Sequence, residues 1–395
     1  MTSGRVARRP SGRGRIAAAT LAAALAAGPL VAVASSSDAA QPAATTRSAQ
    51  SVLSSMTLGQ RVGQLFMVGS PATSASPATL SQISRYHVGN VMLTGRSYGG
   101  TRTPAAVAAA LQARTTQAAT AGVRLLVATD QEGGHVQVLQ GPGISTMPTA
   151  LTQGTWSTSR LQSAAGTWAG QLRASGVNMN LAPVTDTVPS AAAALHNPPI
   201  GAYQREFGYT PTRVASHSIA FSTGMDTHGV VPTVKHFPGL GRVTQNTDTS
   251  SGVTDHVTQR GGYYVNAFRA PIRSGHVPFV MMSTAYYAKI DSHHPAAFSP
   301  FIIRTMLRGD YGFTGAVISD DLGKARQVSP WSYGDRALQF LRAGGDVVLT
   351  VDPATLPAMY AAVLHRARGN DAFRAKVNAA ALLVLQTKQS HHLLG

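Results

Sequence analysis

The sequence contains no cysteine, so the chain can form neither disulfide bonds nor a lipid-anchored N-terminal cysteine. Its stability must come from a hydrophobic core, and 395 residues, 44% of them hydrophobic, are enough to build one. No Gly-x-Gly-x-x-Gly run follows the first strand-like segment, which argues against a dinucleotide-binding fold. The basic residues form no dense cluster and no nucleic-acid motif, so we expect no nucleic-acid partner.

Acidic residues are scarce, because 16 Asp and Glu stand against 33 Lys and Arg, and the formal net charge is +17. A strongly basic protein attracts anionic surroundings. Of the candidates, we favour a wall polymer over a membrane surface or nucleic acid. The alternative is that the charge has no specific partner.

The N-terminus has the pattern of a secretory signal peptide, which we assign to residues 1–34. An Arg-rich start is followed by an apolar run from Ile16 to Ala34, which ends in the small-x-small sequence Ala-Val-Ala. An uncleaved anchor helix is the alternative, but the break at Gly28 and Pro29 favours cleavage. The pattern therefore predicts a secreted or cell-wall-associated protein with no stable membrane insertion after cleavage.

Residues 35–51 are polar and small, and we predict a flexible linker there. Residues 52–395 alternate apolar, strand-like runs with helical patterns, which predicts a single (β/α)8 TIM-type barrel of the α/β class that ends in C-terminal helices. A doubly wound open sheet is the alternative. The eight predicted strands are 63–68, 88–93, 124–129, 177–183, 230–234, 279–283, 316–319 and 346–351. The predicted helices include 104–119, 157–174, 210–227, 263–274, 299–310 and 336–343.

The most informative run extends from Val234 to Gly241 and reads Val-Lys-His-Phe-Pro-Gly-Leu-Gly. It places Lys235 and His236 at the end of a predicted strand, where (β/α) barrels carry their chemistry. A surface lysine and a core histidine at an ordinary turn would give the same pattern. Other strand ends carry polar residues as well, so the pair does not stand alone.

Three further segments place polar residues after predicted strands. Asp130 opens the run Asp-Gln-Glu-Gly-Gly, where a carboxylate can accept two neighbouring hydroxyls and glycines allow close approach. Arg205 lies in Arg-Glu-Phe-Gly, and its forked donors suit the oxygens of a ligand. Asp320 and Asp321 follow the seventh strand, where an Asp pair could also be a simple helix cap.

These runs resemble the motifs of glycoside hydrolase family 3, above all its bacterial β-N-acetylhexosaminidases, from about Met56 to the C-terminus. The resemblance implies a retaining mechanism in which Asp320 is the nucleophile, and Asp321 takes that role if the register is shifted by one. It also implies that the sugar is held by Asp130, Arg205, Lys235 and His236. Neither a cofactor nor a metal is required, and we expect a monomer. Lys235 is expected to lie close enough to Asp320 to keep it ionised.

The chain departs from the family pattern at two places. His135 and Val138 stand where the family has arginines. In the loop after the Lys-His run, the family's acid/base is a histidine in Asp-Ser-His, but here Ser250 takes the histidine's place. We predict Asp248 as the acid/base, with Asp255 or His256 as alternatives.

The resulting hypothesis is a secreted hydrolase that removes terminal β-linked N-acetylglucosamine from peptidoglycan or chitin fragments. A different class of function remains open, namely a glycan-binding protein that has lost its proton shuttle. A β-glucosidase of the same family is a third possibility. It is disfavoured because the roughly 40 residues after the last predicted strand are too few for the second domain that many members carry.

Overall fold

The computed structural model describes residues 47–395, so the predicted signal peptide and most of the predicted linker lie outside the described residues. The linker was predicted to extend to residue 51. Helix α1 (Ala49–Ser55) begins inside it, because Ser48 accepts a hydrogen bond from the Ser51 N–H and caps the helix. Val52 and Leu53 are buried, and the helix packs against the C-terminal helix α13.

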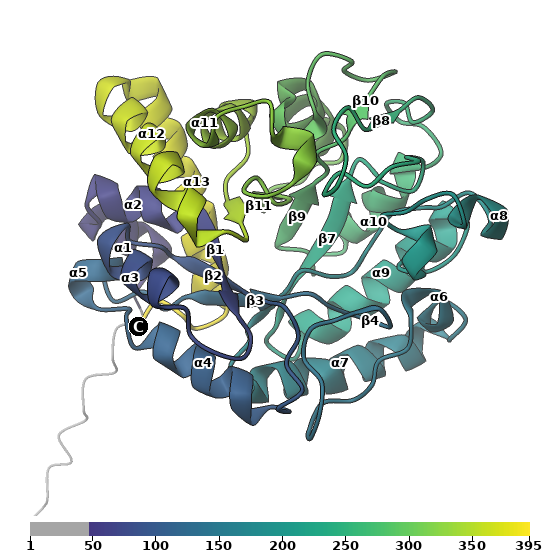
Figure 1. Ribbon diagram of the computed structural model, residues 1–395, viewed down its shortest axis with the longest axis horizontal. Coiled ribbons are helices and arrows are strands. Elements are labelled where there is room, and N and C mark those ends of the chain that lie inside the picture. Colours follow the sequence, from purple (N-terminus) through teal and green to yellow (C-terminus); the bar gives the residue numbers. More distant parts are fainter. Residues whose placement is uncertain (1–46) are drawn as a thin grey trace, which may run out of the picture. The chain divides into compact units, whose positions relative to one another are not determined.

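Eight parallel strands form the centre of the molecule (Figure 1) and confirm the predicted barrel. Their order is β11-β9-β7-β6-β3-β2-β1-β12, and a parallel bridge between Ile318 and Val347 joins the two ends. The strands are β1 (Phe66–Pro71), β2 (Asn90–Thr94), β3 (Leu126–Thr129), β6 (Met179–Asn180), β7 (Val231–Phe237), β9 (Phe279–Met282), β11 (Ala316–Ser319) and β12 (Val348–Thr350).

Each predicted strand overlaps an observed one, but the first was predicted to begin too early. Residues 63 and 64 belong to helix α2 (Leu58–Gln64). This helix is fixed by a capping box, in which Thr57 and Gln60 exchange side-chain and backbone hydrogen bonds. The local cap therefore determines where the helix lies, and the strand starts only after it.

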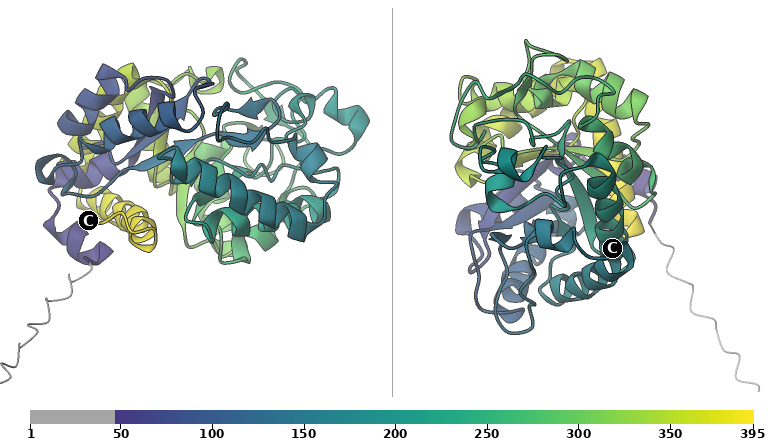
Figure 2. Two further views of the ribbon diagram at one scale, coloured as in Figure 1. Left: turned by 90° about the horizontal axis from the view of Figure 1, so that it is seen from below. Right: turned by 90° about the vertical axis from the view of Figure 1, so that its right-hand side faces the viewer.

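Helices surround the strands on the outside, as Figures 1 and 2 show. None of them, within residues 47–395, is long and apolar enough to cross a membrane. The longer helices are α3 (Pro77–Arg85), α4 (Arg102–Gln112), α7 (Thr158–Ala174), α9 (Pro211–Asp226), α11 (Tyr333–Ala343), α12 (Leu356–Gly369) and α13 (Asp371–Ser390), with a π-helix at Phe301–Asp310. Short helices are α5 (Gln117–Thr120), α6 (Ala150–Gln153), α8 (Ala191–Ala194) and α10 (Arg269–Arg273), and 3-10 turns are η1 (Gly201–Tyr203), η2 (Val265–Phe268), η3 (Ala296–Phe298), η5 (Arg326–Val328) and η6 (Pro353–Thr355).

The core has two parts, because successive strand residues point to opposite faces. One set fills the barrel interior, and the other packs between strands and helices. The interior set also includes Val384 of α13 and Leu393, so the C-terminal segment closes the barrel at the end where the strands begin. The interior residues from the strands and their ends are Met67, Met92, Leu126, Ala128, Met179, Leu181, Val231, Phe279, Met281, Ala316, Ile318, Val347 and Leu349.

Strand β7 is buried along its whole length and carries Lys235 and His236 near its end. Its register with β9 is regular at Thr233 and Val234 but shifts before Phe237. The irregularity falls at the Lys-His pair, and such irregularities change the direction in which side chains point. The end of β7 is therefore shaped to present these two side chains at the mouth of the barrel.

Candidate active site

A pocket of about 310 Å³ opens where the strands end, within the range typical of small-molecule sites. Its floor is the top of the barrel interior, formed by Met92, Leu181, Met281 and Leu349. All six residues predicted from the sequence line this pocket, although they come from five different segments: Asp130, Arg205, Lys235, His236, Asp248 and Asp320.

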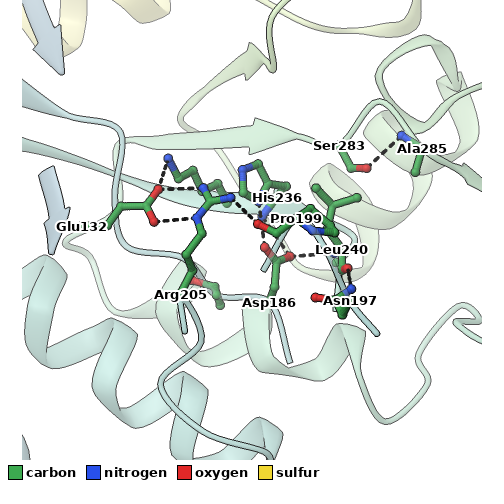
Figure 3. Close-up of polar contacts among 12 residues, drawn as sticks. Glu132, Asp186, Asn197, Pro199, Arg205, His236, Leu240, Ser283 and Ala285 are labelled. Atoms are coloured by element: carbon green, nitrogen blue, oxygen red, sulfur yellow. Dashed lines mark hydrogen bonds and ion pairs between the residues drawn. The ribbon is translucent and has the colours of Figure 1, made fainter. Parts of the chain in front are cut away.

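One side of the pocket is a network of four charged residues. The Lys235 Nζ lies 2.6 Å from Asp130 Oδ1 and 2.6 Å from Glu132 Oε1. Arg205 donates two parallel hydrogen bonds of 2.8 Å to Glu132, from Nε to Oε2 and from Nη2 to Oε1, as Figure 3 shows. The third nitrogen, Nη1, donates to the Pro199 carbonyl at 2.6 Å. Two cations and two carboxylates thus balance each other, and these pocket side chains are held in fixed positions.

Pairing shifts the pKa values of this network in favour of the charged forms. Burial alone would raise the pKa of Glu132, but Arg205 and Lys235 outweigh it and lower the pKa to about 2. Burial likewise opposes the charge of Lys235, yet Asp130 and Glu132 raise its pKa above the usual value. Glu132 and Lys235 therefore stay ionised at every physiological pH.

His236 is oriented by Asp186, which is fully buried beneath it (Figure 3). Asp186 Oδ2 lies 2.7 Å from His236 Nδ1, and Oδ1 accepts the His236 N–H at 3.1 Å and the Leu240 N–H at 2.7 Å. Since Nδ1 is occupied, Nε2 is the ring nitrogen available to a substrate. The same carboxylate fixes the turn after β7, so Asp186 has a structural role.

The hydrogen bonds of Asp320 and Asp321 show which one is available for chemistry. Asp321 is buried, and its two oxygens accept three backbone N–H groups, from Gly323 (2.9 Å), Lys324 (2.9 Å) and Val351 (3.0 Å). Asp320 is half-buried, and its Oδ1 accepts only the Asp321 N–H, at 2.8 Å. Asp321 thus anchors the loop, and the Asp320 carboxylate is the one available in the pocket.

Asp248 lies on the loop after β7 and lines the same pocket. The loop is positioned at its start by Asn197, whose Nδ2 donates to the Leu240 and Val243 carbonyls at 2.8 and 2.7 Å. The crowded surroundings of the carboxyl raise the pKa of Asp248 to about 6, and the negative charges of Asp320 and Asp321 add to this effect. A carboxyl with this pKa can both give and take a proton near neutral pH.

The sequence of residues 57–386 matches the family model described as the glycosyl hydrolase family 3 N-terminal domain. The chain belongs to glycosyl hydrolase family 3. Among its relatives, a β-hexosaminidase of Stenotrophomonas maltophilia is 30% identical over 329 residues, covering 81% of this chain and 90% of the relative. A β-hexosaminidase of Xylella fastidiosa is 32% identical over 317 residues, covering 78% and 89%.

Solved structures of the same family have the same fold. The β-N-acetylhexosaminidase of Beutenbergia cavernae is 53% identical, with a TM-score of 0.83, and the match covers 84% of this chain and 98% of that one. A family 3 β-N-acetylglucosaminidase of a Paenibacillus species is 29% identical, with a TM-score of 0.76, covering 86% of this chain and 63% of that one. The predicted family resemblance is therefore confirmed.

Within this family 3 pocket, the structure shows where each alternative for the acid/base lies. Asp255 is fully buried and accepts the N–H groups of Val257 and Thr258 at 2.7 and 2.8 Å, so it is a turn cap. His256 is exposed and does not line the pocket, and neither does Ser250. Of the loop's candidates, only Asp248 lines the pocket.

Two features of the site differ from what the sequence suggested. Lys235 was expected beside Asp320, but its ion-pair partners are Asp130 and Glu132. Glu132, which holds Arg205 and Lys235 together, was not singled out at all. Its spacing could have revealed it, because residues two apart in extended chain share a face, and Asp130 was already a candidate.

The remaining sequence features fall outside the pocket. His135, which replaces a family arginine, is exposed and packs edge-on against Tyr203 with ring centroids 6.0 Å apart. Within the described part of the chain, no group of three or more His, Cys, Asp or Glu side chains is placed to hold a metal ion. The pocket itself is lined by the carboxyls of Asp248 and Asp320, and a pair of carboxyls is the equipment that glycoside hydrolysis uses.

Proposed function

We propose that this protein is a retaining β-N-acetylhexosaminidase, which removes terminal β-linked N-acetylglucosamine from a glycan. The observation that carries the proposal is the difference between the two aspartates after β11. Asp321 accepts three backbone hydrogen bonds, whereas Asp320 accepts one and is available in the pocket. The β-hexosaminidases and β-N-acetylglucosaminidases among the relatives support this sugar specificity over that of a β-glucosidase.

In the first step, an Asp320 carboxylate oxygen attacks the anomeric carbon while the bond from that carbon to the glycosidic oxygen breaks. Asp248 donates its proton to the departing oxygen, so the aglycone leaves as an alcohol. Lys235, Arg205 and Asp130 hold the sugar, and their fixed network prevents it from moving during the attack. The product of this step is a glycosyl ester on Asp320.

In the second step, a water molecule replaces the aglycone. Asp248, now ionised, takes a proton from the water, and the water oxygen bonds to the anomeric carbon as the ester bond to Asp320 breaks. Two inversions give net retention, and both carboxyl groups return to their starting states. An Asp248 pKa of about 6 suits this double role, because neither form is strongly disfavoured near neutral pH.

We further propose that the enzyme is secreted, acts as a monomer, and works on peptidoglycan or chitin fragments. The signal-peptide pattern of residues 1–34 and the net charge of +17 support an extracellular setting close to an anionic wall polymer. Localisation of the full-length chain by cell fractionation, with an Arg8→Ala and Arg9→Ala variant for the export route, tests the first point. Recovery of the full-length chain only from the cytosol would contradict it.

One departure from the family pattern favours a second candidate, a glycan-binding protein without turnover. Ser250 stands where the family's histidine is expected, and a serine cannot shuttle a proton near neutral pH. The two candidates differ in a single observable, which is hydrolysis.

The deciding experiment is hydrolysis of p-nitrophenyl N-acetyl-β-glucosaminide, with the corresponding glucoside in parallel. We expect turnover of the acetamido sugar, little turnover of the glucoside, and loss of activity in Asp320→Asn. Mass spectrometry of the wild type with a slow 2-fluoro substrate should show a glycosyl adduct on the peptide that contains Asp320. Binding of N-acetylglucosamine without any hydrolysis would establish the binding protein instead.

A further inference from the structure

The segment that follows the nucleophile runs alongside the loop that carries Asp248. It contains the 3-10 turn η5 (Arg326–Val328), and its backbone pairs with the loop at two points. The Arg326 N–H donates to the Asp248 carbonyl at 3.1 Å, and the Gln327 N–H donates to the Thr247 carbonyl at 3.0 Å. The acid/base candidate is therefore bonded directly to the connection between β11 and α11.

Gln327 adds a second attachment through its side chain, which is 1% exposed. Its Oε1 accepts the Val253 N–H at 2.9 Å, and its Nε2 donates to the Val253 carbonyl at 3.3 Å. One amide side chain thus meets both backbone groups of one residue, as a neighbouring strand would. The Gln327 backbone holds Thr247 and its side chain holds Val253, so a single residue fastens both ends of the tip 248–252.

The tip itself has little else to hold it. Four of its five residues are exposed, and Ser250 is half-buried. Its other hydrogen bonds are local, such as those from the Asp248 N–H to Asn246 Oδ1 at 2.9 Å and from the Ser250 N–H to the Asn246 carbonyl at 2.9 Å. These bonds shape the turn, but they do not fix where it lies over the pocket.

We infer that Gln327 is a positioning residue that keeps the Asp248 carboxyl over the leaving-group oxygen. The inference rests on the proposed role of Asp248 as the acid/base. Gln327 touches neither the pocket nor the substrate and acts only through the loop tip. Because it lies seven residues after Asp320 in the same connection, it also ties the two catalytic carboxyls to one segment. A displacement of about 1 Å at such a group can lower a rate by roughly 10²-fold.

The test is Gln327→Leu, which keeps the volume and removes both side-chain hydrogen bonds. The readout is kcat/KM, which reports the first chemical step, for N-acetyl-β-glucosaminides that carry a dinitrophenyl or a phenyl leaving group. Dinitrophenolate departs without protonation, whereas phenol needs the acid. We expect kcat/KM to fall by about 10–100-fold for the phenyl substrate and to stay within about threefold for the dinitrophenyl substrate.

The matched control is Gln60→Leu on helix α2. Gln60 is also a buried glutamine, and it bonds to Thr57 and to the carbonyls of Gln117 and Ala118, away from the pocket. This variant should lose stability without any dependence on the leaving group. Gln327→Glu, which keeps the acceptor for the Val253 N–H, should show a smaller leaving-group effect than Gln327→Leu and serves if the leucine variant does not fold.

Asp248→Asn on the same two substrates separates the inference from the function it rests on. If Asp248→Asn shows the leaving-group dependence and the folded Gln327 variants lose both substrates equally or neither, the positioning role is wrong and the proposed function stands. If Asp248→Asn itself shows no dependence on the leaving group, Asp248 is not the acid and the proposed mechanism fails first. For the dinitrophenyl substrate, kcat also depends on the second step, in which Asp248 acts as the base. A rise in the kcat of Gln327→Leu on addition of azide would support the inference, because azide replaces water without needing a base.

Discussion

The two sides of the pocket differ in whether their charged side chains are paired. On the sugar-holding side, Asp130, Glu132, Arg205 and Lys235 pair every charge at distances of 2.6–2.8 Å. On the catalytic side, three carboxyls, those of Asp248, Asp320 and Asp321, line the same cavity. No lysine, arginine or histidine of the described chain lies within ion-pair distance of these three.

This contrast shows that cationic partners can outweigh the effect of burial on the pKa of a carboxyl. Glu132 is deeply buried, yet its pKa falls to about 2 because two cations contact it. Asp248 lies on an exposed loop tip and has no such partner, and its crowded surroundings, followed by the charges of Asp320 and Asp321, raise its pKa to about 6. The first group fixes a geometry, and the second can exchange a proton.

The largest expected effect is at the nucleophile, and its neighbour is the control. Asp320→Asn should lower kcat/KM by about 10⁴-fold or more, with an unchanged Tm, because Asn keeps the oxygen that accepts the Asp321 N–H. Asp321→Asn should instead cost about 1–3 kcal/mol of unfolding free energy, since an amide cannot accept all three backbone N–H groups. An Asp321→Asn protein that is stable and as inactive as Asp320→Asn would reverse the assignment.

The next effect concerns the proton donor. Asp248→Asn should lower kcat/KM for a phenyl glycoside by about 10²–10⁴-fold, the usual worth of general acid catalysis. The acid must be protonated, and its pKa is about 6, so the wild-type rate should fall about tenfold per pH unit above that value. The decline should be absent from the pH profile of Asp248→Asn. If the variant keeps the wild-type profile, another group supplies the proton.

The sequence predicted much of this site because several of its motifs stand directly after strands. All eight strands were recognisable, since a buried apolar run bounded by polar residues has few alternative structures. The four predicted residues at strand ends followed from that pattern, whereas Arg205 and Asp248 lie in loops and were predicted only from the family resemblance. Asn197 and Gln327 were not recognisable, because their roles depend on partners 43 to 74 positions away in the chain. Asp320 and Asp321 could not be separated by sequence, since only the direction of each side chain distinguishes them.

The third prediction removes one carboxylate from the side of the pocket where the charges are paired. Glu132→Gln leaves Asp130 as the only anionic partner of Arg205 and Lys235 in the network. Removing one partner of a buried ion pair typically costs about 3–5 kcal/mol of unfolding free energy. The folded-state pKa of Glu132 lies below its usual 4.5, so its stabilising effect is complete above pH 4.5 and is lost as pH falls toward 2. Urea unfolding should therefore show a gap between wild type and variant that is wide at pH 7 and narrower at pH 3.

Glu206→Gln is the matched control for that experiment. Glu206 is also fully buried, but neither carboxyl oxygen has a hydrogen-bond partner within residues 47–395. Burial, followed by the charge of Asp186, raises the pKa of Glu206 to about 7. Its ionisation thus destabilises the fold as pH rises from 4.5 through 7, and Glu206→Gln should be at least as stable as wild type at pH 8. If Glu132→Gln and Glu206→Gln lost the same unfolding free energy, charge pairing would not explain the difference between these two buried carboxyls.

The smallest expected effect extends the comparison to a buried lysine outside the pocket. Lys388 of α13 is as buried as Lys235, but its Nζ bonds to Gln64 Oε1 and the Gly89 carbonyl, both neutral, at 2.8 Å. Burial lowers its pKa to about 7, whereas carboxylates raise that of Lys235. The folded state therefore binds fewer protons than the unfolded chain between about pH 7 and 10.5, and wild-type stability should rise with pH there. In urea unfolding, the unfolding free energy of wild type relative to Lys388→Met should rise by about 2 kcal/mol between pH 7 and 9. A constant difference across that range would show that Lys388 stays charged despite its neutral partners.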